Sequence, residues 1–200
     1  METNFLKNFA KRYSCKEFDE NKKVSLSDLN EIVEVFRLSP SMLNIQPWKL
    51  FIIEDKNLKK SLQTHSLNQE QVWTNSHLLV FARKNHIDDE HIFEVIWQKE
   101  KNQVYEWIKW FMDSMSELEK EVWAISQVSV ALWNVISFLA EKKIDSCPIW
   151  LLNRENYDKV LHLNEKWYST VFALVIWYAK QEHQTNKKRL EQKYIAEYIN

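Results

Sequence analysis

The segment SPSMLNIQPWKLFII (residues 39–53) places a polar turn with two prolines directly before a strand-like run. A residue that precedes proline is pushed out of the helical region, so Ser39 and Gln46 are expected to be extended. The turn offers hydroxyl and amide groups and carries no charged side chain in residues 39–48. Such a turn suits a polar, largely planar ligand, although its spacing alone favours an ordinary surface turn.

Around this segment the hydrophobic pattern predicts a single domain with helices on a sheet. Ser25, followed by Asp28, resembles a capping box at a helix start. Residues 169–179 are almost continuously apolar and β-prone, as in a buried strand. The predicted helices are 3–13, 24–39, 56–65 and 121–142, with a less regular helical region at 86–120. The predicted strands are 49–55, 77–83 and 169–179, with an extended segment at 144–150.

Size and charge restrict the possible functions. The chain has 200 residues, enough for one domain (1–200) with a substantial core. Its 27 basic and 28 acidic residues nearly cancel, so we expect neither a nucleic-acid nor a membrane partner. No secretory signal and no apolar run of about 18 residues is evident. Cys15 and Cys147 form no disulfide framework or metal pattern, which favours a cytoplasmic protein.

One feature of the composition is abnormal: the chain contains no glycine and ten tryptophans. Average usage near 7% would give roughly 14 glycines in a chain of this length. Because glycine supplies positive φ at turns and helix ends, its complete absence has a physical cost.

Two short basic segments are candidate anion sites. In KRYSCKEF (residues 11–18), Arg12, Ser14 and Lys16 occupy alternate positions. An extended backbone would aim all three to one side, as a grip for phosphate. Lys187 and Arg189 repeat this alternation near the C-terminus. The alternative for both segments is a solvated basic surface.

Other candidate residues favour structural roles. HIDDEH (residues 86–91) has metal-ligand residue types but no helical His pair, so we predict no metal site. Cys147 is interpreted as a small buried residue, and His77 as structural. No Ser-His-Asp order, phosphate-binding loop or dinucleotide fingerprint is present, so nothing in the sequence suggests acyl transfer, nucleoside triphosphate hydrolysis or a Rossmann site.

The order of these segments along the chain resembles the nitroreductase family of FMN enzymes. The resemblance covers Phe9 to Leu190 and is carried by five consecutive segments. These are KRYSCKEF, SPSMLNIQPWKLFII, NQEQVWTNSHLLVFA, SQVSVALWNVISFLAEKKIDSCPI, and a late strand followed by KKR.

The resemblance implies an α+β fold, with a central, mainly antiparallel sheet flanked by helices. It implies an intertwined homodimer with each FMN in the interface between chains. Residues 86–118 would then be a variable helical insertion near the acceptor pocket. Residues 180–200 would be a C-terminal extension.

The resemblance also implies a set of flavin-binding residues. The ribityl phosphate would contact Arg12, Ser14, Lys16, Lys187 and Arg189. The polar edge of the ring would face Asn68 and Gln71, and the region near its reactive nitrogen would be lined by Pro148, Ile149 and Trp150. Contacts from the second chain would come from Ser41, Met42 and Asn44, where Met42 replaces the small polar residue common in the family.

The implied activity is transfer of hydride from NADH or NADPH through FMN to a small-molecule acceptor, such as a nitroaromatic or a quinone. A single open ring face implies a ping-pong order, with no residue acting as catalytic acid or base. Two alternatives remain: other flavin chemistry on the same fold, such as dehalogenation or flavin fragmentation, and a non-catalytic dimer disabled by Met42 and Trp150.

The resemblance also bears on the missing glycines. Trp133, Trp150, Trp167 and Trp177 stand where relatives commonly have glycine, whereas Trp48 and Trp123 match family tryptophans. A lineage that reads the UGA codon as glycine would give this pattern when its gene is translated with UGA as tryptophan. The alternative is a deliberately glycine-free variant.

Overall fold

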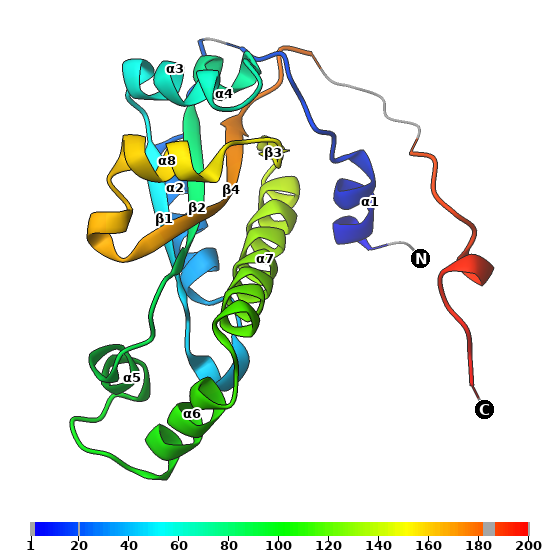
Figure 1. The fold of residues 1–200 in the computed structure, drawn as a ribbon. Coiled ribbons are helices and arrows are strands. Elements are labelled where there is room, and N and C mark those ends of the chain that lie inside the picture. The colour runs from blue at the N-terminus through cyan, green and yellow to red at the C-terminus, as the bar shows by residue number, and fades with distance from the viewer. Residues whose placement is uncertain (1–2, 20, 182–186, 200) are drawn as a thin grey trace.

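The computed structural model describes residues 3–19, 21–181 and 187–199, and a four-stranded antiparallel sheet lies at the centre of these residues (Figure 1). The spatial order of the strands is β1-β2-β4-β3. The strands are β1 Trp48–Ile53, β2 His77–Lys84, β3 Asp145–Ile149 and β4 Tyr168–Trp177. The predicted α+β class and antiparallel sheet are therefore confirmed.

The two central strands form the interior of the sheet. β2 and β4 pair antiparallel, with Leu79 opposite Leu174, and the register shifts between Phe81 and Ala82. Every residue from 171 to 177 is buried. A strand buried on both faces gives a continuous apolar run, which is why the sequence pattern located β4 correctly.

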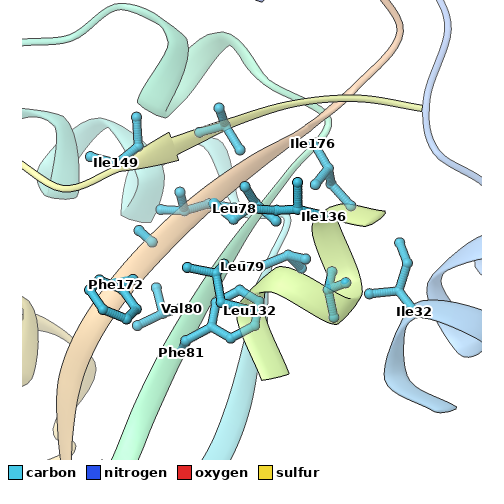
Figure 2. Close-up of a cluster of buried hydrophobic side chains, with 14 of the residues drawn as sticks. Ile32, Leu78, Leu79, Val80, Phe81, Leu132, Ile136, Ile149, Phe172 and Ile176 are labelled. Atoms are coloured by element: carbon cyan, nitrogen blue, oxygen red, sulfur yellow. The ribbon is translucent and has the colours of Figure 1, made fainter. Parts of the chain in front are cut away.

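The longest helix, α7 (Glu117–Glu141), packs against this sheet. It begins with a capping box, in which Ser116 accepts from the Glu119 backbone and the Glu119 side chain accepts from the Ser116 backbone. Figure 2 shows Leu132 and Ile136 of α7 beside Leu79 and Phe81 of β2. α7 is long and apolar enough to cross a membrane, but these contacts identify it as a core helix.

Shorter helices flank the sheet at sites that the apolar periodicity largely predicted. α2 begins after Ser25, whose side chain accepts from the Asp28 backbone as expected. α4 and α8 were not predicted, because α4 is a single turn and α8 is mostly polar. The shorter helices are α1 Asn4–Lys11, α2 Leu26–Arg37, α3 Lys56–Thr64, α4 Gln71–Thr74, α5 Asp89–Ile96, α6 Gln103–Asp113 and α8 Arg154–Leu161.

A second, smaller core lies away from the sheet. It joins α5 and α6 to the polar turn before β1, and at its centre Ile45, Ile92 and Ile108 are fully buried. α5 and α6 occupy the region 86–118 and project beyond the main body (Figure 1). This small core is therefore the link between that helical region and the turn.

The two ends of the chain lie next to each other. The Lys187 amine donates to the carbonyl of Phe9 at 2.6 Å, and Asn8 of α1 donates to Glu141 at the end of α7. The C-terminal segment then runs away from the sheet (Figure 1), and Tyr198 and Ile199 are both 92% exposed. Of the predicted extension 180–200, residues 182–186 and 200 lie outside the described residues.

Candidate functional site

The chain after α1 runs along the edge of the sheet. Arg12 caps the C-terminal end of α1, and Ser14 forms a parallel bridge with Ser146 of β3. Cys15 is fully buried, whereas Arg12 and Ser14 are only partly buried. This path places Arg12 and Ser14 beside β3, and a common side for Arg12, Ser14 and Lys16 stays a prediction.

Three cations from opposite ends of the chain converge here. Burial lowers the pKa of Arg12, and the nearby Arg189 lowers it further against an opposing effect of Cys147. Burial likewise lowers the pKa of Lys187, and Arg12 and Arg189 add to that effect. Among the described residues none of these three makes an ion pair. A cluster of cations without a carboxylate partner fits an anionic ligand such as a phosphate group.

Cys147 of β3 marks the centre of this region. Burial raises the pKa of its thiol, and the charges of Lys16 and Arg12, together with a hydrogen bond from Gln71, act in the opposite direction. The thiol is therefore protonated at neutral pH, which agrees with its interpretation as a small buried residue rather than a nucleophile. Arg12 and Lys16 of the N-terminal segment and Gln71 of α4 thus approach the same point of β3 from two parts of the chain.

Asn68 and Gln71 come from the turn that leads into α4. Gln71 is buried and its amide donates to Gln69 at 2.9 Å. Asn68 is exposed with φ 53°, a conformation that asparagine tolerates. The Asn68 carbonyl accepts from Gln63 of α3, so the turn has a fixed shape next to β3.

The end of β3 presents three residues in different ways. Pro148 is partly buried, and the Ile149 side chain lies in the core at 1% exposure, so only its backbone is available to a ligand. Trp150 is 50% exposed, and its ring meets Phe172 edge to face, with centroids 4.4 Å apart. An indole of this size restricts access to the surface beyond β3.

The polar turn lies elsewhere on the same chain. The Met42 backbone donates to Gln127 of α7 at 2.8 Å. Asn8 of α1, which precedes the Phe9 carbonyl that Lys187 contacts, donates instead to Glu141 at the end of α7. Fourteen residues separate positions 127 and 141, or about 21 Å along a helix axis. Ser41, Met42 and Asn44 are therefore not brought together with the basic cluster within one chain.

One expectation for this turn is wrong. Gln46 was expected to be extended because it precedes Pro47, yet its φ is +51°. The reason is local: the Gln46 N–H is held by the Ser41 hydroxyl at 2.9 Å, and the Gln46 carbonyl accepts from Trp48 at 2.8 Å. These two hydrogen bonds outweigh the preference for an extended backbone at the residue before Pro47.

The sequence pattern did not predict the structural contacts of two residues near the polar turn, His91 and Asp88. His91 was noted only as part of HIDDEH, and it contacts the Ile45 carbonyl at 2.6 Å. Asp88 caps α5. Within the described ranges no group of three potential His, Cys, Asp or Glu ligands is present.

The class of protein follows from comparison with known sequences. A sequence model of the Nitroreductase family matches residues 9–176. The chain therefore belongs to the Nitroreductase family. It is 31% identical to a Staphylococcus epidermidis protein named "Putative NAD(P)H nitroreductase", over 96% of this chain and 94% of that protein. A Staphylococcus haemolyticus protein with the same description is 35% identical over 74% of each chain.

Solved structures show the same fold. A Staphylococcus epidermidis structure titled "putative NAD(P)H:FMN oxidoreductase" superposes with a TM-score of 0.85 at 22% identity, covering 99% of this chain and 97% of that one. An Exiguobacterium sibiricum structure titled "putative nitroreductase in complex with FMN" gives a TM-score of 0.84 at 22% identity, over 100% of this chain and 99% of that one.

Proposed function

We propose that this chain is an FMN-dependent oxidoreductase that takes electrons from NADH or NADPH and reduces nitroaromatic or quinone-type acceptors in a ping-pong order. The observation that carries the proposal is the convergence of Arg12, Lys187 and Arg189 without an acidic partner. When bound, FMN supplies a ring that accepts hydride and passes it on. The free buried thiols of Cys15 and Cys147 favour a cytoplasmic location.

The residues of this chain would bind and orient the cofactor. Arg12 and Arg189 each offer a guanidinium that can hold a phosphate through two hydrogen bonds, while Lys16 and Lys187 add charge and Ser14 a hydroxyl. Asn68 and Gln71 would meet the polar edge of the ring, and the end of β3, Pro148 to Trp150, would lie against it. No acid or base of the protein is required for this transfer.

The remaining contacts would come from a second copy of the chain. The turn that carries Ser41, Met42 and Asn44 is held near the middle of α7, far from the basic cluster of its own chain. Exposed apolar side chains on α7 and on the C-terminal segment, such as Val130 (41%) and Ile195 (68%), also favour a covering partner. We therefore propose a homodimer in which each site is completed by the turn of the other chain.

The test is a titration of the purified protein with FMN, followed by anaerobic NADPH and then NADH. We expect a protein-bound flavin band that bleaches with one of the two donors and returns when a quinone is added. Recovered flavin should be intact by chromatography, since fragmentation would indicate the alternative flavin chemistry. A folded dimer that retains no flavin would contradict the proposed function.

A matched pair of ligands tests whether the basic cluster, Arg12, Lys187 and Arg189, binds the phosphate of FMN. Riboflavin has the same ring as FMN but lacks the phosphate. Arg12→Ala should therefore weaken FMN binding and leave riboflavin binding unchanged, with Lys11→Ala on the same helix as the control. Equal losses for both ligands would show that Arg12 does not hold the phosphate.

A further inference from the structure

The polar turn has a conformation that its own residues do not favour. Leu43, Asn44 and Gln46 have φ of 52°, 56° and 51°. Asparagine tolerates this left-handed region, but leucine and glutamine have no side-chain feature that favours it. Such strained residues persist only where the surrounding structure holds them, and they concentrate at functional sites.

Two side chains from other elements hold this turn. The Gln127 side-chain oxygen on α7 accepts the backbone N–H of Met42 at 2.8 Å. His91 on α5 donates from Nε2 to the Ile45 carbonyl at 2.6 Å, a bond that requires the proton on that nitrogen. His91 is only 9% exposed, and burial lowers its pKa, so the neutral ring is favoured.

These contacts hold the backbone of the turn at Met42 and Ile45, and they leave the side chains of residues 42–44 exposed. Ile45 is fully buried in the small core, whereas Met42 is 47% exposed. The exposed residues 42–44 are the ones proposed to contact the flavin of the second chain. We infer that Gln127 and His91 are positioning residues, which hold the strained turn in the shape that completes the partner's flavin site. This inference rests on the proposed function.

The test compares Gln127→Leu, which removes the acceptor, with Gln127→Glu, which keeps one. We expect the Kd for FMN to rise about ten-fold in Gln127→Leu, the effect of one lost hydrogen bond, and to return toward wild type in Gln127→Glu. The thermal midpoint of the flavin-free protein should not change. His91→Leu should also weaken FMN binding. The control is Ser137→Ala, a partly buried position on α7 whose hydroxyl bonds only within the helix, to the Trp133 carbonyl.

The outcomes are distinguishable. If wild type binds FMN and Gln127→Leu binds it equally well, the positioning role is overturned and the proposed function stands. The role is also overturned if weaker binding accompanies a lower midpoint without flavin and Gln127→Glu does not restore it. If wild type itself binds no FMN, the proposed function fails first.

A second inference comes from independent observations at the tryptophans. Four helical turns in the described residues end in a pair of bonds that defines the Schellman motif, and two of them carry tryptophan at the left-handed position. At Trp97 these bonds are Gln98 N–H to Phe93 at 3.2 Å and Trp97 N–H to Glu94 at 3.3 Å. At Trp167 they are Tyr168 N–H to Leu163 at 3.0 Å and Trp167 N–H to Asn164 at 3.2 Å. Glycine is the usual residue at this position.

The indole rings at these two positions have no packing role that would explain them. Trp97 is 88% exposed and Trp167 is 68% exposed, with φ of 56° and 62°. A bulky side chain in the left-handed region is a conformational outlier. The backbone at these two helix ends therefore has the conformation that favours glycine, and the exposed indole contributes no burial that would offset its cost.

Trp177 shows the same conflict inside the protein. It is 1% exposed, and its ring centroid is 2.5 Å from that of Phe18. Aromatic pairs are separated by about 4.5–7 Å, so the space between β4 and the Phe18 segment does not hold an indole. By contrast, Trp48 and Trp123 each have an aromatic neighbour at 5.7 Å.

We propose that positions 97, 167 and 177 are glycine in the natural protein, because its UGA codons are read as glycine. The test is the codon at each position in the source gene. TGA at 97, 167 and 177 with TGG at 48 and 123 is expected, and peptide masses of the protein from its source should then show glycine. TGG at the first three positions would overturn the proposal, and so would TGA at 48, where the core requires an indole.

Discussion

The two ends of the sheet accommodate tryptophan in opposite ways. Trp48 begins β1, is 9% exposed and lies 5.7 Å from the ring of Phe36 of α2. Trp177 ends β4 and is even more buried, and its ring centroid is placed 2.5 Å from that of Phe18, closer than two aromatic rings can pack. Burial alone therefore does not show that a side chain fits its site. The separation between rings does, because it measures whether the surrounding space matches the residue.

An unpaired indole N–H does not distinguish a tryptophan that fits its site from one that does not. The indole nitrogens of Trp177 and Trp123 are both buried without a partner. Trp123 nevertheless packs at an ordinary distance against Phe111. Stability measurements on matched substitutions are the direct way to test the distinction.

The largest effect is expected at Trp48. Trp48→Ala should lower the free energy of unfolding by about 3–5 kcal/mol, because it removes a well-packed indole and leaves a cavity. Urea unfolding followed by circular dichroism measures this change. A loss below about 1 kcal/mol would remove the contrast with Trp177, since it would show that the β1 site does not depend on its indole either.

Trp177→Gly should act in the opposite direction. Relief of overpacking should raise the free energy of unfolding by about 1–3 kcal/mol, reduced somewhat by the cost of glycine within a strand. The same urea titration provides the measurement. A decrease comparable with that of Trp48→Ala would mean that the Phe18 side of β4 rearranges to pack an indole, and it would contradict the glycine assignment there.

The exposed helix ends should show a smaller gain. Trp97→Gly and Trp167→Gly should each raise the free energy of unfolding by about 1 kcal/mol, by removing a bulky residue from the left-handed region. The control is Trp107→Gly, also on an exposed indole but inside α6, which should lower it by about 0.5 kcal/mol through helix propensity. Thermal unfolding of the four proteins, wild type included, tests this. A lower free energy of unfolding in all three variants would indicate that the indole side chains themselves stabilise the fold.

Lys59 is a buried residue that, unlike Trp177, has groups around it that suit its side chain. It is 2% exposed, and its amine donates to the carbonyls of Asn75 at 2.5 Å and Ser76 at 3.2 Å. Burial, then the nearby Lys23 and Lys56, lowers its pKa to about 8, against opposing effects of Glu54 and Asp55. His77 is adjacent, through its hydrogen bond with Ser76.

The sign of the resulting pH dependence follows from proton binding. Between about pH 8 and 10.5 the unfolded chain keeps the Lys59 proton and the folded chain has lost it, so this group makes stability rise with pH in that window. The difference in the free energy of unfolding between wild type and Lys59→Met should show this rise with pH. A difference that is flat from pH 7 to 11 would place the pKa of Lys59 at its ordinary value.

Much of the fold was predictable because its elements have long, regular apolar patterns. The buried run of β4 and the stripe on α7 are local properties of the chain, and both were located correctly. α4 and α8 were missed, because one turn and a mostly polar helix leave no such pattern.

The site was predictable only in part. The alternation of Arg12 and Ser14 is visible in the sequence, but the approach of Lys187 to Phe9 spans 178 positions. Gln127 and His91 contact the turn across 85 and 46 positions, and neither has a local pattern that marks it. The positive φ of Gln46 depends on the Ser41 hydroxyl five residues earlier, a bond that outweighs the ordinary preference before proline.

The separation of the turn from the basic cluster along α7 has a genetic consequence. In the proposed homodimer each site takes its cations from one subunit and its turn from the other. A chain with a defective turn and a chain with a defective cluster would each be inactive alone. Paired in one dimer, they would place both defects in one site and leave the other intact. Two null alleles of this gene, expressed together, would then restore half of the activity to each mixed dimer.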